Sequence, residues 1–229
     1  MQILESSMLG LRTARMVFRS RGSPVAITLY PMVHVGDARF YRETYEEAFS
    51  HDVALIEGVR SPVGRNLTRS YRWVDFEKLD LVLQPKSPPQ EDVPARIVRA
   101  DLTAEEFHAE WRKVSLLLRA GILFAAPLVG IHRRLFSSRR SLAQDMCLED
   151  RRSSDEILDW SPRLEPMKHS ILHARDERLI ACIAAELEGS EEKRVAIVYG
   201  AAHMRAVLRE LARRGFHCSE SSWRTVIST

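Results

Sequence analysis

Short apolar runs divide this chain into regular segments. Four of them are rich in β-branched residues and apolar at nearly every position, which is typical of strands buried on both faces of a sheet. These expected strands are residues 24–35, 52–59, 95–100 and 194–199. Between and after them, apolar residues recur at helical spacing. The clearest such segments are residues 38–50, 166–187 and 203–215. Strand, helix and strand in succession form βαβ units, which build parallel sheets.

The middle of the chain departs from this alternation. A proline-rich break at Pro85–Pro89 interrupts it, and helical patterns dominate from about residue 101 to 152. Two capping-box patterns predict helix starts, Thr103 with Glu106 and Ser153 with Glu156. The segment before residue 24 is expected to lead into the first strand, and the tail 216–227 to form a closing strand.

These segments together predict an α/β fold. We expect one domain over residues 1–229, with a mixed, mainly parallel sheet flanked by helices. A helical insertion in the middle of the chain, at about 60–165, would interrupt the βα alternation.

Composition and charge narrow the class of protein. The chain is 45% apolar and 28% charged, with 34 basic and 31 acidic residues and a net charge of +3. That balance argues against a dedicated nucleic-acid-binding protein. Three cysteines without CxxC spacing indicate neither a disulfide framework nor a cysteine metal site, so a reducing, cytoplasmic location is expected. The arginine-rich N-terminus lacks the apolar core of a secretory signal.

One apolar stretch, Val114–Ile131, bears on membrane contact. It contains Arg119 and Pro127, and its purely apolar part begins only at Ala120. A bilayer span needs about 20 apolar residues. The stretch therefore favours a buried core helix or an interfacial helix over a span, and peripheral membrane contact stays a hypothesis.

Polar residues follow the expected strands where those strands end. His34 ends the first strand, Glu57 the second and Asp101 the third, and His203 follows the last one through the small-residue turn Gly200–Ala202. Ligands of open α/β sheets bind at the carboxyl ends of the strands. Each residue also has a structural interpretation: a packing histidine, a glutamate exposed beyond a shorter strand, or an aspartate that starts a helix. Asp37, a further candidate, is interpreted as a helix cap.

Two arginines lie on one expected helix face. Arg175 and Arg178 share that face with Ile171 and Ala174, which point to the core. A guanidinium directed inward implies a carboxylate or an anionic ligand. The alternative is a surface network with the two acidic residues between the arginines, which would contribute little stability.

Two histidines and a carboxylate are a workable ligand set for Zn, Mn, Co or Fe. His34, Glu57 and His203 come from separate segments, so no HExxH-type motif supports the set. The chain also lacks a GxSxG elbow, a Walker loop and a GxGxxG fingerprint. Serine catalysis and nucleotide binding are therefore disfavoured.

Taken together, these residues resemble the TraB/PrgY/GumN and Tiki family of the erythromycin-esterase/ChaN-like clan. That family has two GxxH motifs, a glutamate after the first and an arginine before the second. The second motif is present as Gly200–His203, the glutamate matches Glu57, and the arginine is best matched by Arg178. The first motif reads Pro31–His34, with proline where the family has glycine.

The resemblance covers residues 24–60 and 166–215 and implies an EreA/ChaN-like fold. Tiki members resemble metal-dependent peptidases that use the GxxH histidines and the glutamate. His34, Glu57 and His203 would then hold a divalent metal. Glu57 and His203 would also act in catalysis, and Arg178 would stabilise the oxyanion or hold a substrate carboxylate. Other members are linked to peptide-pheromone shutdown.

Two main hypotheses follow. The first is a metal-dependent hydrolase that cleaves a peptide or ester bond in a peptide or small-molecule substrate. The second is a non-catalytic module that binds a peptide, haem or a metal in the same pocket. Asp101, Asp37 and Arg175 are additional candidate residues, and formation of a homo-oligomer stays open.

Overall fold

A seven-stranded mixed sheet forms the centre of the computed structural model, which describes residues 2–59, 61, 69–86, 92–151 and 165–229. The strand order is β1-β2-β3-β8-β5-β7, and β9 also pairs with β2. The strands are β1 (Leu4–Ser7), β2 (Gly10–Ser20), β3 (Ser23–Met32), β5 (Val53–Ile56), β7 (Arg96–Arg99), β8 (Lys193–Gly200) and β9 (His217–Ser228). A separate two-stranded ladder joins β4 (Val35–Gly36) to β6 (Val82–Leu83).

The apolar runs form the parallel part of the sheet. Strand β8 lies between β3 and β5, and β7 is the outer strand beside β5, all parallel. The central side chains Leu29, Leu55 and Ile197 are fully buried, as continuous apolar strands covered on both faces should be. The expected α/β fold with a mixed, mostly parallel sheet flanked by helices is confirmed.

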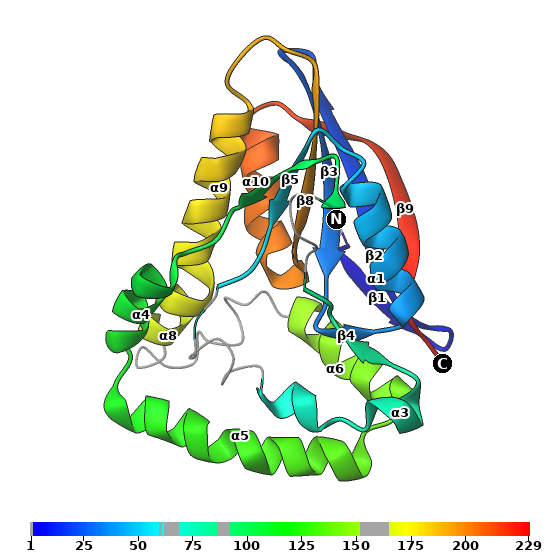
Figure 1. Ribbon diagram of the computed structural model, residues 1–229, viewed down its shortest axis with the longest axis vertical. Coiled ribbons are helices and arrows are strands. Elements are labelled where there is room, and N and C mark those ends of the chain that lie inside the picture. The colour runs from blue at the N-terminus through cyan, green and yellow to red at the C-terminus, as the bar shows by residue number, and fades with distance from the viewer. Residues whose placement is uncertain (1, 60, 62–68, 87–91, 152–164) are drawn as a thin grey trace.

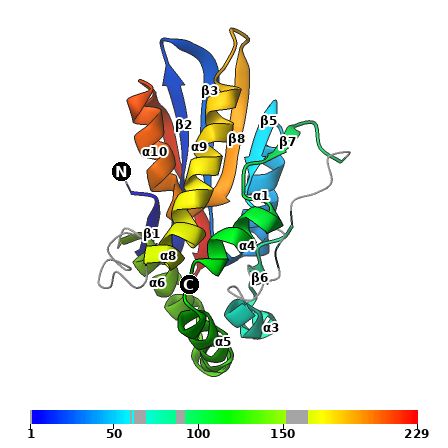
Figure 2. The same cartoon turned by 90° about the vertical axis from the view of Figure 1, so that its left-hand side faces the viewer.

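Two connections cross the sheet in opposite directions. Helix α1 (Ala38–Ala48) links β3 to β5 across β8, and helix α9 (Ala174–Glu186) precedes the return to β8. Right-handed crossovers running in opposite directions place their helices on opposite faces. Accordingly α9 and α10 (Met204–Arg213) lie on one side of the sheet and α1 on the other (Figures 1 and 2).

The N-terminal segment differs from the prediction. It forms strands β1 and β2, which pair antiparallel before the first expected strand begins. The arginines that obscured this pattern are matched by acids: Arg12 pairs with Glu5 and Arg15 with Glu47. The expected closing strand in the tail is confirmed as β9, which runs antiparallel along β2.

The middle of the chain supplies most of the remaining helices. Helices α4 (Ala104–Arg112), α5 (Leu116–Phe136) and α6 (Arg139–Arg151) follow β7, and α5 lies across one end of the molecule (Figure 1). Shorter segments are η1 (Arg69–Trp73), α3 (Phe76–Leu79), α8 (Glu165–Lys168), the π-helical turn η4 (His169–His173) and the 3₁₀ turn η5 (Ala201–His203).

The helix starts test the capping predictions. Thr103 and Glu106 form the predicted capping box at the start of α4. The pair Ser153 and Glu156 lies outside the described residues. Asp37 occupies the predicted N-cap position of α1, but its side chain makes no capping hydrogen bond.

The Asp37 carboxylate instead accepts a hydrogen bond from Arg139 at 2.5 Å and others from Ser228. A guanidinium donor makes a stronger bond than a backbone N–H, and this explains why the carboxylate turns away from the helix. Asp37 therefore ties α6 and the C-terminal strand to the start of α1, and it lies outside the Glu57 cluster described next.

Candidate functional site

Glu57 lies at the centre of a charged cluster at the carboxyl ends of the parallel strands. Its backbone N–H continues the ladder of β5 by donating to Val198. Its side chain is 18% exposed and accepts hydrogen bonds through both oxygens. Oε1 accepts from Arg175 Nη2 at 2.5 Å, and Oε2 accepts from the backbone N–H of Gly200 at 2.6 Å. Glu57 is thus a largely buried carboxylate that joins two segments distant in the sequence.

Arg175 joins Glu57 to the second carboxylate of the cluster, Asp101. Its Nε and Nη2 donate to the two Asp101 oxygens at 2.9 and 2.7 Å. The backbone N–H groups of Gly58 and Leu102 hold the same carboxylate. Burial disfavours the charged form of Arg175. The nearby carboxylates Glu57 and Asp101 outweigh this effect and raise the pKa of Arg175. Asp101, for which a helix-start role stayed open, belongs to this cluster while Thr103 caps the helix.

The surrounding charges keep Glu57 ionised. Burial alone would raise the pKa of Glu57, but Arg175, then His203 and His34, outweigh burial and lower it to about 2. A carboxylate with so low a pKa is a poor proton acceptor at neutral pH, because catalytic bases work best near the operating pH. Glu57 therefore acts as a fixed negative charge.

The low pKa of Glu57 predicts an acid-dependent loss of stability. A lowered folded-state pKa stabilises the folded state above the unfolded pKa of 4.5, and this contribution disappears as the pH falls toward about 2. We expect Glu57→Gln to lower the free energy of unfolding by about 3 kcal/mol at neutral pH, and by progressively less in that acid window. Urea titrations across pH measure this. Glu43→Gln, which breaks an exposed pair with Arg39, is the control. A Glu57→Gln effect that stayed constant down to the lowest pH would contradict the charge-based explanation.

His203 stands beside this cluster with a carboxylate of its own. The residue is 3% exposed, and its Nδ1 lies 2.7 Å from Asp176 Oδ1. Because a carboxylate only accepts hydrogen bonds, Nδ1 carries the proton and Nε2 keeps its lone pair. Asp176 thus fixes the tautomer and the orientation of the ring. A carboxylate on Nδ1 is the usual support for a histidine that binds metal or moves protons through Nε2.

Two residues of this site were missed in the sequence. The sequence places Asp176 only in the alternative surface network and Tyr199 only in an expected strand. The Tyr199 ring packs edge-on against His203 at 4.9 Å, with Arg175 5.7 Å from its centre. Its buried hydroxyl has no hydrogen-bond partner among the described residues, and burial raises its pKa. The signal for Asp176 was its position one turn before the buried Leu179.

Gly200 allows the two halves of the site to approach each other. A Cβ atom at this position would lie 2.9 Å from Glu57 Oε2 and 3.5 Å from the His203 ring. Ordinary side chains do not tolerate the shorter distance without displacement. The glycine of the GxxH motif is therefore explained here by the close approach of the Glu57 carboxylate to the backbone.

This approach predicts the effect of adding one methyl group. We expect Gly200→Ala to lower the free energy of unfolding by about 1–3 kcal/mol, since Glu57 must move away from its hydrogen bonds. Gly22→Ala is the matched control, because its Cβ would meet only Ser20 Oγ at 3.9 Å. Thermal and urea unfolding of both variants measure the difference. Equal stabilities would show that Glu57 is not held against Gly200.

His34 lies at the outer side of the cluster. It follows β3, is exposed, and its ring stands 5.4 Å from that of Tyr71. Its carbonyl accepts a hydrogen bond from the Gln84 N–H at 2.8 Å. His34 is also among the groups that lower the pKa of Glu57, after Arg175 and His203. The structure brings His34, Glu57, Asp101, Arg175 and His203 to one end of the sheet.

Arg178 lies apart from the other candidates. Its guanidinium pairs with Glu106 on α4, and both side chains are about 40% exposed. The helix turns Arg175 toward Glu57 and Asp101, and three residues later Arg178 has passed to the side facing α4. Of these two arginines, Arg175 is the one that contacts Glu57 and Asp101.

A metal site formed by His34, Glu57 and His203 fits this arrangement only in part. The Nε2 atom of His203 suits a ligand, but both Glu57 oxygens already accept hydrogen bonds, and the Arg175 guanidinium supplies the neighbouring positive charge. Among the described residues, no group of three or more His, Cys, Asp and Glu side chains is placed to hold a metal. As arranged, the three residues do not fit a shared metal ion.

Comparisons with known proteins give no relative. No protein-family model matches the chain, and no curated protein and no solved structure matches it.

Proposed function

We propose that this chain is a hydrolase for a peptide or ester bond, with His203 as the base that activates water. The observation that carries the proposal is the 2.7 Å contact between His203 Nδ1 and Asp176, which leaves Nε2 to accept a proton. Asp176 would stabilise the imidazolium that forms. His203 also lies at the end of the sheet where ligands of open α/β folds bind, and this position supports the proposal.

The other residues of the cluster would shape the charge around this base. Glu57, held as a carboxylate by Arg175, would supply a fixed negative charge beside the base. Arg175 would hold Glu57 and Asp101 in place, and its two carboxylate partners make it a positioning residue. The exposed His34 would face the substrate.

Membership of the TraB/Tiki family, an EreA/ChaN-like fold with a helical insertion, and a cytoplasmic location remain part of this proposal. The family and the fold rest on the Gly200–His203 motif, Glu57 and the strand-end placement of His34. The location rests on the three cysteines without CxxC spacing. The family resemblance also implies a divalent metal, Zn, Mn, Co or Fe, at His34, Glu57 and His203. Because the arrangement of Glu57 and Arg175 does not suit such a metal, no catalytic step is assigned to one.

A second candidate is a module that binds a peptide, haem or a metal without catalysis. It is favoured by the charge balance of the cluster, in which the carboxylates Glu57 and Asp101 are both paired with Arg175. Such a network stabilises a fixed shape. Pro31 in place of the first motif's glycine also favours this candidate.

One experiment separates these proposals. The purified chain is assayed with mixed peptide and ester substrates as isolated, after chelation, and after addition of Zn²⁺, Mn²⁺ or Co²⁺, and its metal content is measured. Hydrolysis that survives chelation supports the His203 mechanism. Hydrolysis that is lost and then restored by metal supports the metal-dependent version, in which His34→Ala and His203→Ala should both lose metal. Absence of hydrolysis under all conditions would overturn the enzyme proposal and favour the binding module.

A further inference from the structure

Helix α5 presents an unusually apolar surface to solvent. Nine of its large apolar side chains are exposed, among twelve such side chains in the described part of the chain. They are Leu116, Leu117, Leu123, Phe124, Leu128, Val129, Ile131, Leu135 and Phe136. By length and composition α5 could cross a bilayer, since its most apolar stretch has a mean hydropathy of 1.4. Only 6% of that stretch is buried inside the protein. It is therefore not the buried core helix that the sequence left open. Exposed apolar patches of this extent mark interaction surfaces.

The opposite face of α5 is packed against the rest of the molecule. Gly130 lies so close to Trp73 that a Cβ there would stand 2.8 Å from the indole, and the Arg133 guanidinium lies 3.9 Å from the centre of the Tyr71 ring. The helix is also held at both ends. The flanking helices insert Trp111 on one side and Leu142 on the other into buried positions. An attached helix of this kind lies along a surface and cannot cross a bilayer without leaving its contacts.

The orientation of α5 suits a flat surface. The helix lies across one end of the molecule, the end toward which strand β3 points (Figures 1 and 2). Its exposed apolar side chains spread over the whole outer half of the helix, since Leu116, Phe124 and Val129 lie at well-separated angles. A seam with a single partner helix needs only a narrow stripe at a and d positions. The wide face favours a lipid phase over a second helix.

The charge distribution of α5 indicates which lipids its surface would bind. No acidic residue occurs from Leu116 to Phe136, although acids make up 31 of the 229 residues of the chain. His132 and Arg134 near its end, and Arg140 just beyond it, are exposed. An apolar helix face with exposed basic residues beside it is complementary to a membrane surface that carries negative headgroups.

We propose that α5 docks this protein on the surface of a bilayer that contains anionic lipids, with Phe124 and Leu128 entering the acyl region. Both side chains are strongly exposed, at 75% and 69%. The helix would lie in the interface plane with its inner face still packed against η1. This inference is independent of the proposed hydrolase function, and docking would bring the carboxyl ends of the parallel strands toward the membrane.

Flotation of the full chain with lipid vesicles tests the proposal. We expect binding to vesicles of phosphatidylcholine mixed with phosphatidylglycerol, and weaker binding to phosphatidylcholine alone. Phe124→Glu with Leu128→Glu should weaken binding on the order of a hundredfold or more. Arg134→Gln with Arg140→Gln should weaken it on the order of tenfold, on the anionic vesicles only.

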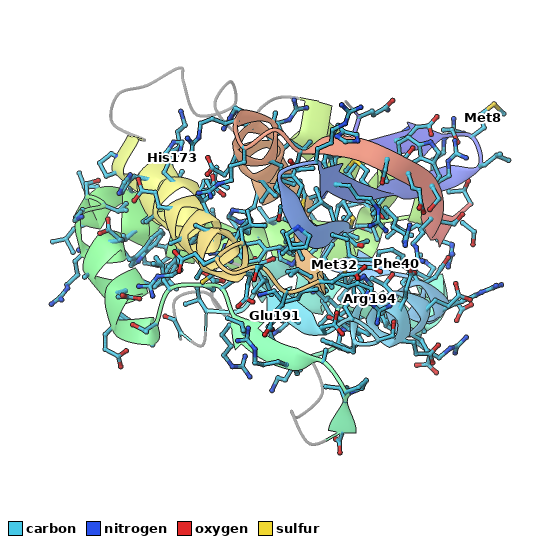
Figure 3. All side chains as sticks on the ribbon, turned by 90° about the horizontal axis from the view of Figure 1, so that it is seen from above. Met8, Met32, Phe40, His173, Glu191 and Arg194 are labelled. Atoms are coloured by element: carbon cyan, nitrogen blue, oxygen red, sulfur yellow. The ribbon has the colours of Figure 1, made fainter. Side chains whose placement is uncertain are left out.

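A matched control places the same change elsewhere. Met8 and Leu9 are exposed at 85% and 76% in the turn between β1 and β2, and Met8 projects from the edge of the molecule (Figure 3). Met8→Glu with Leu9→Glu should leave flotation unchanged. The proposal fails if wild-type protein stays unbound to the anionic vesicles, or if the Phe124/Leu128 variant floats like wild type. It also fails if light scattering finds a wild-type dimer that this variant converts to monomer, because α5 would then be a self-association surface.

Discussion

Arg175→Gln is expected to lower the free energy of unfolding by about 3–5 kcal/mol, whereas Arg178→Gln one turn later should lower it by less than about 1 kcal/mol. The first change leaves two largely buried carboxylates, Glu57 and Asp101, without their shared cation. Their mutual repulsion and lost solvation then oppose folding. The second change breaks a pair with Glu106 whose partners are each about 40% exposed, so water replaces the lost contact.

The two variants form a matched pair, because they change the same residue type on the same helix in the same way. Urea unfolding at neutral pH measures both. Arg175→Lys extends the test: an ammonium cannot reproduce the fork of bonds to Asp101, so we expect it to recover only part of the loss. If Arg178→Gln were the more destabilising of the two, the charged cluster would not be the main electrostatic support of this end of the sheet.

The parallel half of the fold could be predicted because strands that are buried on both faces have a distinctly apolar sequence. The central parts of strands β3, β5 and β8 are covered on both faces, so their residues are nearly all apolar and readily recognised. Strand β2 could not be recognised, because its arginines find acidic partners such as Glu5 and Glu47 only after the chain folds. Ion pairs between distant segments leave no periodic signal in one sequence.

The candidate site shows the same limit at the level of single residues. The predicted strand boundaries place Glu57, Asp101 and His203 at the same end of the sheet, because the carboxyl ends of parallel strands lie at one edge. The choice between Arg175 and Arg178 depends on the rotation of α9, and residues three apart differ by about 60° around a helix. The π-helical turn at His169–His173, directly before α9, shifts that rotation and could not be foreseen. For the same reason Asp176 was assigned to the surface.

If the chain hydrolyses a peptide or ester bond, His203→Gln should lower turnover by about 10²- to 10⁴-fold, because glutamine cannot accept the proton that Nε2 takes from water. Asp176→Asn should lower it comparably. An amide that donates to Nδ1 forces the ring proton onto Nε2, the atom that must be free. The expected loss is therefore in turnover, with the apparent affinity for substrate little changed.

Folding and catalysis must be separated in these variants, since His203 is buried beside Tyr199. Unfolding curves of both variants are recorded with the kinetics. His217→Gln is the matched control. His217 is exposed and stands opposite Arg19 in the ladder of β2 and β9, at the other end of the sheet from the cluster. If Asp176 only held the fold together, an Asp176→Asn variant that is as stable as wild type would keep its turnover. The mechanism instead requires both variants to stay folded and to lose turnover.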